Sequence, residues 1–201
     1  MRFLCLLLGL TWAAVAVNAA HSAPGLFVGL ADDHLKSVPE RAAGPLRNLG
    51  VEAVRLTLAW DGTRTISGAE AHGLATALDA GEGMRIVVTA YARDRMPLSE
   101  SGRDDYCAYL ASIAERFPQV RDFVVWNEMN KSTFWRPQFE GDDSVSPQAY
   151  AQLLARCYDV LHAVRPDVNV IHGGLSSTGN DRPDAVSEHL AFAGPLHPAR
   201  R

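Results

Sequence analysis

The chain has 201 residues, of which 47% are hydrophobic and 21% charged, enough to bury a proper core in one domain. The net charge is −4, and neither blocks of Lys and Arg nor interleaved basic and aromatic residues occur, so nucleic acid is a poor candidate partner. The sequence contains no low-complexity tract and no repeat of solenoid length.

The amino-terminal segment has the pattern of a secretory signal peptide. Arg2 supplies a short positive region, residues 3–17 form an apolar run, and small residues follow, which predicts cleavage after about Ala19. The run is short for a membrane span, and no second apolar run follows it. We therefore expect residues 1–19 to be removed and residues 20–201 to be secreted without a membrane anchor; an uncleaved anchor is the alternative.

Short β-prone runs alternate with helix-like segments through the rest of the chain. The predicted strands are, in chain order, residues 26–31, 52–60, 84–92, 122–128 and 168–175. The predicted helices are residues 38–50, 68–81, 104–118 and 146–166. Apolar residues recur at helical spacing in the last two, and Ser146 and Pro147 give the last one a cap and a first helical residue.

Near-continuous apolar strands that alternate with helices predict a parallel α/β sheet. A doubly wound sheet and a (β/α)8 TIM-type barrel both fit this pattern. The first predicted strand is followed by "GLADDHLK" rather than by a glycine-rich phosphate loop, which weakens the nucleotide-binding version. Polar residues recur at the predicted strand ends, where barrel enzymes build their sites, so we favour the barrel.

Two cysteines would remain after signal removal, Cys107 and Cys157, in an oxidising compartment. Both fall on predicted helices at or near the apolar face. Sequence does not supply the Cα separation that a disulfide requires, so we favour two buried thiols and keep a disulfide as the alternative.

The fourth predicted strand runs directly into "WNEMN", residues 126–130. A carboxyl group at the mouth of an apolar strand is partly desolvated, which favours its protonated form. Glu128 could then protonate a departing glycosidic oxygen, while Asn127 offers an amide to a sugar hydroxyl. An isolated strand-end glutamate more commonly caps the strand or pairs with an arginine.

This motif resembles the "WNEPN" signature at the end of the fourth strand in clan-A glycoside hydrolases. The likeness continues through "FWRPQF" (134–139) and the second strand "VRLTLAWD", and it covers about residues 25–175. The resemblance implies a retaining hydrolase of O-glycosidic bonds, with Glu128 as acid/base, Asn127 as sugar-binding amide and Arg55 steadying the active-site carboxylates. Met129 stands where the family usually has proline, which permits a looser turn.

Other candidate residues carry less specific signals. Trp135 could be a stacking platform for a sugar ring and Tyr91 could line the cleft, although simple packing explains each equally well. Asp32 and Asp33 could bind sugar, but capping of the next helix is favoured, and His172 is expected to be a satisfied core histidine. The spacing of the histidines and cysteines matches no metal-binding motif, so we expect neither metal nor cofactor. The partner that the resemblance implies is a carbohydrate.

The second carboxylate of a retaining mechanism is missing from these candidates. It should lie about 5–5.5 Å from the acid/base, and in the family it ends the seventh strand. Five strands are predicted here, whereas the barrel has eight, and residues 20–201 fall short of its usual length of roughly 250 residues. The late glutamate Glu188 falls in a predicted helix and not at a strand end. We therefore expect residues 20–201 to be a barrel truncated after about five βα units, from a shortened or incomplete gene. Its open sheet edges favour self-association. The alternatives are an inactive carbohydrate-binding remnant and an unrelated secreted α/β protein.

Overall fold

The computed structural model describes residues 26–178; the predicted signal peptide and Glu188 lie outside this range. All five predicted strands are present and form one parallel sheet: β1 (Gly29–Ala31), β2 (Ala53–Ala59), β3 (Arg85–Tyr91), β4 (Asp122–Val125) and β7 (Asn169–His172). The helices are α1 (His34–Ser37), α2 (Pro39–Asn48), α3 (Gly68–Ala80), α4 (Glu100–Arg116) and α5 (Ser146–Val164). A small antiparallel hairpin of β5 (Phe139–Glu140) and β6 (Asp143–Ser144) precedes α5.

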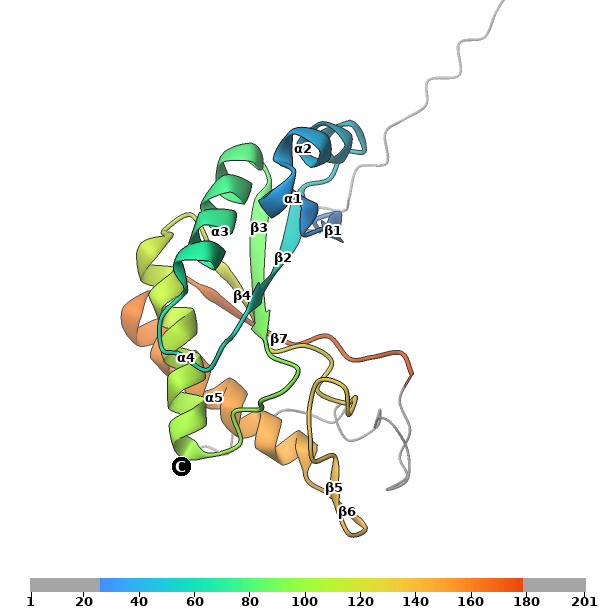
Figure 1. Cartoon of the computed structure of the whole chain (residues 1–201), viewed down its shortest axis with the longest axis vertical. Coiled ribbons are helices and arrows are strands. Elements are labelled where there is room, and N and C mark those ends of the chain that lie inside the picture. Colours follow the sequence, from blue (N-terminus) through green and yellow to red (C-terminus); the bar gives the residue numbers. More distant parts are fainter. Residues whose placement is uncertain (1–25, 179–201) are drawn as a thin grey trace, which may run out of the picture.

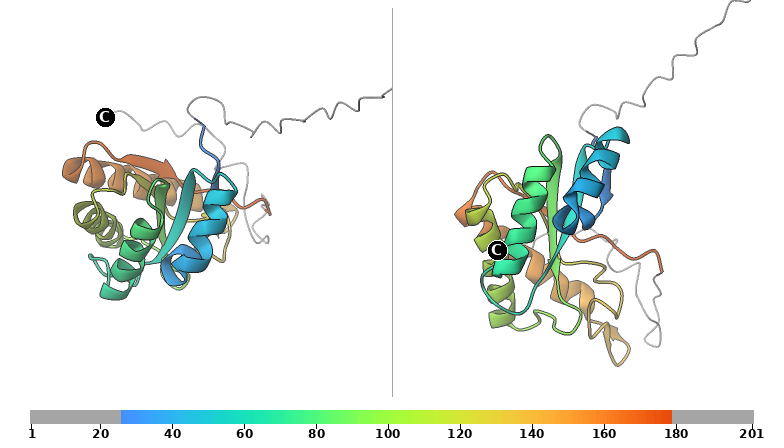
Figure 2. Two further views of the ribbon diagram at one scale, coloured as in Figure 1. Left: turned by 90° about the horizontal axis from the view of Figure 1, so that it is seen from above. Right: turned by 45° about the horizontal axis from the view of Figure 1, so that its top comes forward.

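The strands follow one another across the sheet in chain order, β1-β2-β3-β4-β7. Because right-handed crossovers all step in the same direction, the helices lie along one face of the curved sheet, as the two views of Figure 2 and the labels of Figure 1 show. A doubly wound sheet binds its ligand where the strand order reverses, and the order within residues 26–178 contains no reversal.

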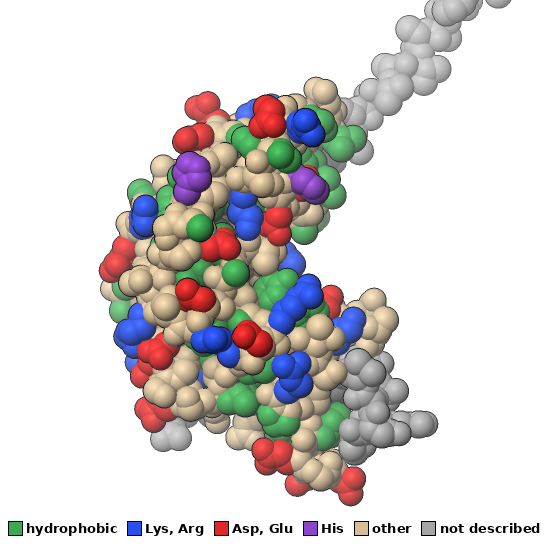
Figure 3. All heavy atoms as spheres, in the orientation of Figure 1, with side chains coloured by type: hydrophobic (Ala, Val, Ile, Leu, Met, Phe, Trp, Pro, Cys, Tyr) green, Lys and Arg blue, Asp and Glu red, His purple; other side chains and the backbone are tan. Residues whose placement is uncertain are grey.

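The hydrophobic core lies between this sheet and its row of helices. Val54, Leu56 and Leu58 of β2 are fully buried, whereas the alternate residues Arg55 and Thr57 are half-buried. Side chains alternate between the faces of a strand, so Arg55 and Thr57 belong to the face that the helices do not cover. Figure 3 shows the described residues as a C-shaped body, hollowed between the end that carries α1 and α2 and the end that carries the hairpin.

A partly buried ion pair joins the amino-terminal ends of β3 and β4. Asp122 is 2% exposed and accepts hydrogen bonds from both Arg85 Nε (2.6 Å) and Arg85 Nη2, and also from Asn169 Nδ2 (2.8 Å). Burial by itself would raise the pKa of the Asp122 carboxyl, but the hydrogen bonds from Arg85 and Asn169 and the Arg85 charge outweigh it and lower the pKa. A pocket of about 870 Å³ opens here, at the sheet end opposite to the "WNEMN" motif.

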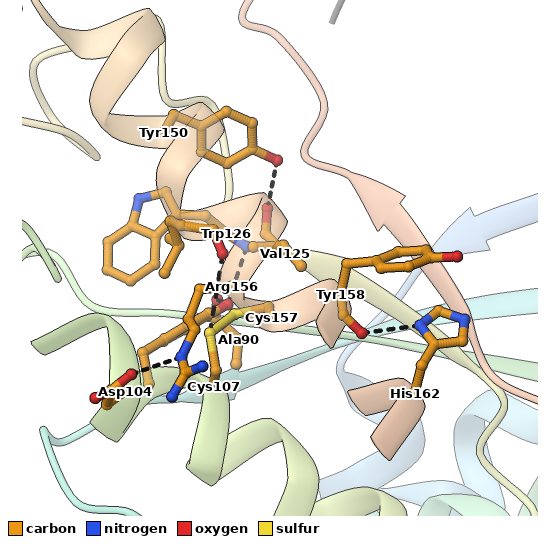
Figure 4. Close-up of a disulfide and its surroundings, with 12 residues drawn as sticks. Ala90, Asp104, Cys107, Val125, Trp126, Tyr150, Arg156, Cys157, Tyr158 and His162 are labelled. Atoms are coloured by element: carbon orange, nitrogen blue, oxygen red, sulfur yellow. Dashed lines mark hydrogen bonds and ion pairs between the residues drawn. A yellow bond between two sulfur atoms is a disulfide. The ribbon is translucent and has the colours of Figure 1, made fainter. Parts of the chain in front are cut away.

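Helices α4 and α5 are joined by a disulfide between Cys107 and Cys157, whose Cα atoms are 4.7 Å apart (Figure 4). The favoured interpretation of two separate buried thiols is therefore wrong. The geometry was not visible in the sequence because the two residues are 50 positions apart and meet only when the helices pack. Beside the bridge, Arg156 Nε donates to Asp104 Oδ1 at 2.6 Å, a second link between the same helices.

Strands β1 and β7 form the two edges of the sheet, and apolar side chains are exposed on and before β1. Leu26, Phe27, Val28 and Leu30 are 46–64% exposed. Within residues 26–178 no further strand pairs with these edges. Edge strands with exposed apolar side chains favour edge-to-edge pairing, so we expect a protein of residues 20–201 to self-associate as its concentration rises in sedimentation velocity. The double variant Val28→Lys/Leu30→Lys should suppress this self-association. A monodisperse monomer that melts cooperatively would contradict the expectation.

Candidate functional site

The backbone leaves the extended conformation earlier than predicted at the end of β4. The strand ends at Val125 rather than at Glu128, and two residues of the motif have positive φ, Trp126 at 65° and Glu128 at 38°. The left-handed region costs a non-glycine residue about 1–2 kcal/mol. Such residues persist only where the surroundings enforce them, and they cluster at functional sites.

Trp126 is fixed in this conformation by its surroundings. Its side chain is fully buried, its indole Nε1 donates to the Phe134 carbonyl at 2.7 Å, and its own carbonyl accepts from the Thr89 hydroxyl at 3.0 Å. The rings of Trp60 and Trp135 meet the indole edge to face, with centroids 6.1 and 5.6 Å away. The strain at Trp126 is therefore held by packing and hydrogen bonds that a shift of this residue would break.

Arg55 and Asn127 come together on the open face of the sheet. Arg55 Nη2 donates to Asn127 Oδ1 at 3.3 Å, so a side chain from β2 spans β3 to reach the residue next to Glu128. Asn127 is 7% exposed and Glu128 is half-buried, with its backbone N–H donating to the Gly174 carbonyl at 3.0 Å. The Nε of Arg55 is buried and has no hydrogen-bond partner within residues 26–178. Within the described residues, one guanidinium N–H of Arg55 thus remains without a partner next to the Asn127 amide.

The loop after Glu128 is anchored by polar side chains that the sequence did not predict in this role. Asn130 forms two hydrogen bonds with the backbone of Ser176, to its carbonyl (3.1 Å) and from its N–H (2.8 Å). Gln138 Nε2 donates to the Met129 carbonyl at 2.9 Å. Ser146 does not cap α5 with its side chain as expected, because its hydroxyl donates to Gln138 Oε1 at 2.9 Å instead. These contacts fix both sides of the carboxyl-bearing turn.

Tyr91 lies at the end of β3 and lines a pocket of about 430 Å³ at the carboxyl-terminal ends of β2 and β3. Its half-buried ring meets Phe134 edge to face at 5.3 Å, and the same pocket is lined by Thr57 and Arg93. This position agrees with a side chain that lines the cleft, although the packing on Phe134 is an equally direct reason for its placement.

Trp135 does not fit the expectation of a sugar-stacking platform. Its side chain is fully buried, between the rings of Trp126 and Tyr150, with centroids 5.6 and 6.0 Å away. A pyranose needs an open aromatic face, and this indole offers none. The sequence signal failed because an aromatic residue in a loop does not reveal whether the loop folds back onto the core.

The aspartates at the other strand ends are engaged in local structure. Asp32 Oδ1 accepts from the backbone N–H (2.9 Å) and ring Nδ1 (2.8 Å) of His34, and Asp61 Oδ1 accepts from the N–H (3.0 Å) and hydroxyl (2.6 Å) of Thr63. These hydrogen bonds lower the pKa of both carboxyls. Asp33 was expected to cap the next helix, but its Oδ1 accepts from Thr57 N at 2.7 Å and ties the loop to β2.

His172, at the end of β7, was expected to be a core histidine whose ring nitrogens both have hydrogen-bond partners. This expectation is wrong for Nε2. That nitrogen is buried without a hydrogen-bond partner in the described part of the chain, and the ring packs edge to face on Tyr150 at 5.0 Å. Burial lowers the pKa of His172, and a hydrogen bond with the Gly173 backbone opposes this only in part.

The lowered pKa of His172 should make the fold acid-sensitive. Between the ordinary histidine value of about 6.5 and the lower folded value, the unfolded chain binds the proton more readily, so the free energy of unfolding should fall as pH drops. We expect urea titrations at pH 7 and pH 5 to show this loss in the native protein and a smaller loss in His172→Gln. His162→Gln serves as control and should lose as much as the native protein. An equal loss in His172→Gln would contradict this.

The positive φ of Glu128 should be measurable as stored strain. Asparagine tolerates the left-handed region far better than glutamate, so we expect Glu128→Asn to raise the free energy of unfolding by about 1 kcal/mol in urea titrations. Glu128→Gln is the matched control, since it removes the same charge but keeps the longer side chain in the strained conformation, and should change little. A Glu128→Asn protein no more stable than Glu128→Gln would show that the position is unstrained.

No family model matches the chain, and no curated protein matches it either. Among the residues that the structure describes, no helix is both long and apolar enough to span a membrane. Within the same range, no three histidine, cysteine or acidic side chains are grouped so that they could hold a metal ion.

Proposed function

We propose that this protein is a secreted glycoside hydrolase, or the amino-terminal part of one, and that Glu128 is its acid/base. The observation that supports this best is the turn after β4, where a half-buried carboxyl in a strained backbone conformation follows a buried amide bonded to Arg55. A strained backbone, preceded in sequence by an amide that a guanidinium holds, suits a carboxyl that must be kept in place to deliver a proton to a sugar oxygen.

A (β/α)8 barrel is the architecture that we propose for the whole enzyme. The sequential strand order and the helices on one face suit a sheet that goes on to close on itself. In such a barrel the open face becomes the interior, and Arg55 and Thr57 would lie among its inward-pointing residues. Glu128, Asn127 and Tyr91 would then lie at the carboxyl-terminal ends of the strands, where barrel enzymes place their chemistry.

Glu128 can supply only half of a retaining mechanism. It would protonate the departing oxygen while a second carboxylate attacks the anomeric carbon, and would then deprotonate the water that releases the sugar. Within residues 26–178 we assign no nucleophile, because Asp32, Asp33 and Asp61 are engaged with local donors. We therefore propose that the nucleophile comes from outside the described residues.

The test is a titration of the purified chain with gluco-, xylo- and manno-oligosaccharides, followed by NMR of the Glu128 backbone amide, which every variant retains. We expect saturable shifts with a Kd on the order of 1 mM for one series, about tenfold weaker in Asn127→Ala. Asn48→Ala, at the exposed end of α2, is the control and should bind like the native protein. Binding unaffected by Asn127→Ala would contradict the proposed role of the amide, and any turnover that continued undiminished in Glu128→Gln would contradict the acid/base role.

A further inference from the structure

A buried tyrosine bridges β3 and β4 at the rung where their direct pairing stops. The last paired residues of the two strands are Ala90 and Val125. Beyond them, the hydroxyl of Tyr106 on α4 accepts a hydrogen bond from Trp126 N at 3.0 Å and donates one to the Ala90 carbonyl at 2.7 Å. Tyr106 is fully buried, and burial raises the pKa of its hydroxyl, so this proton stays in place at neutral pH.

A second buried tyrosine makes the same bridge on the other side of β4. Val125 and His172 are the last paired residues of β4 and β7. Beyond them, the hydroxyl of Tyr150 on α5 accepts from Gly173 N at 2.8 Å and donates to the Val125 carbonyl at 3.0 Å, the bond drawn in Figure 4. Gly173 suits this close approach, because a Cβ there would lie 2.9 Å from the Val125 carbonyl oxygen.

Each hydroxyl stands where neighbouring strands would otherwise bond directly. In both bridges the amide donor and the carbonyl acceptor belong to adjacent strands, and one oxygen atom is inserted between them. At this rung the oxygen takes the place of direct pairing on both sides of β4, and on the β7 side direct bonding resumes only at Glu128, whose N–H donates to the Gly174 carbonyl at 3.0 Å. A strand end paired on both sides stays extended, with negative φ, whereas a released one can turn into the left-handed conformation found at Trp126 and Glu128.

We propose that Tyr106 and Tyr150 are positioning residues that set the backbone conformation from which Glu128 presents its carboxyl. The sugar chemistry at Glu128 rests on the function proposed above, but the bridges do not. The two tyrosines are themselves anchored, because Cys107 follows Tyr106 and is joined by the disulfide to Cys157 on the helix that carries Tyr150. Phenylalanine would fill the same space but would leave the buried strand groups without the bridging oxygen.

The first measurement is the backbone ¹³Cα and ¹³Cβ chemical shift of Glu128 in Tyr106→Phe and Tyr150→Phe. We expect both variants to move these shifts toward values typical of extended backbone. Tyr109→Phe is the matched control, because Tyr109 also lies buried on α4 but donates its hydroxyl to a carbonyl of β2, that of Ala59 at 3.1 Å. It should leave the Glu128 shifts unchanged.

The second measurement is the rate at which N-bromoacetyl glycosylamines of glucose, xylose and mannose alkylate Glu128. The carboxylate displaces bromide and forms an ester, which mass spectrometry locates. We expect the limiting rate to fall about ten- to a hundredfold in Tyr106→Phe and Tyr150→Phe, with the half-saturating reagent concentration changed less than about twofold. Tyr109→Phe should react at the native rate.

The outcomes separate the two proposals. The positioning role would be overturned if the Glu128 chemical shifts were the same in both Phe variants as in the native protein. It would also be overturned if the chemical shifts changed but Glu128 was alkylated at the native rate. If the native protein is never alkylated at Glu128 but the chemical shifts change in the Phe variants, the glycosidase proposal is contradicted. The tyrosine bridges then still determine the conformation of this turn. If one Phe variant does not fold, the other tests the bridge on the opposite side of β4.

Discussion

A protein with alanine at both Cys107 and Cys157 should lose about 4 kcal/mol of unfolding free energy. The disulfide spans 50 residues of chain, and a crosslink over a loop of this length removes much of the conformational entropy of the unfolded state. Both cysteines are fully buried, and alanine keeps the site apolar. Urea titration of the native protein and the double variant measures the difference directly.

The control for this experiment is Asp104→Ala, which removes the ion pair with Arg156 between the same two helices. That pair is partly exposed, with 34% of the aspartate side chain accessible, so its loss should cost less than about 1 kcal/mol. If the double alanine variant unfolded at the same urea concentration as the native protein, the crosslink between α4 and α5 would contribute nothing to stability.

The Asp122→Asn variant should show the next largest loss, about 3 kcal/mol. An amide at this position cannot replace the charged, two-point contact with Arg85, and removing one partner of a buried pair leaves the other without compensation. We expect the lower end of the usual range because 36% of the Arg85 side chain is exposed to water.

The same variant should also change the acid side of the stability curve. Because the pKa of Asp122 is lowered in the folded state, its contribution is present above about pH 4 and is lost as pH falls through the folded value. Asp122→Asn should therefore lose less stability than the native protein on acidification below pH 4. Asp105→Asn, which breaks the exposed pair with Arg64, is the control, and a similar loss in both variants at pH 7 would contradict a special role for Asp122.

Periodicity and turn residues were enough to predict the parallel sheet and four of its helices. The β2 and β3 strands carry apolar or β-branched side chains at most positions, and α4 and α5 have apolar positions at helical spacing, so local pattern and tertiary packing agree. The four-residue helix α1 and the β5–β6 hairpin were missed because elements this short carry no periodic signal. The barrel remains a proposal, since closure depends on strands beyond the described residues.

The candidate site was predicted less completely than the sheet. The motif located Glu128 and Asn127, and the bond from Arg55 confirms that two of the three expected residues meet. What holds the turn was not predicted, because Tyr106 and Tyr150 look like ordinary core residues on their helices. Only the folded chain brings their hydroxyls to the strand ends, 20 and 25 residues away in sequence.

Sugar-directed alkylation of the native chain is the most direct test that Glu128 belongs to a carbohydrate site. We expect one of the N-bromoacetyl glycosylamines to place a single ester on the peptide that contains Glu128, with saturation kinetics and with protection by the parent oligosaccharide. The ester should be absent from Glu128→Gln, while bromoacetamide without a sugar should show no preference for this residue. Labelling that ignores the sugar, or that persists at the same rate in Glu128→Gln, would contradict the proposed site.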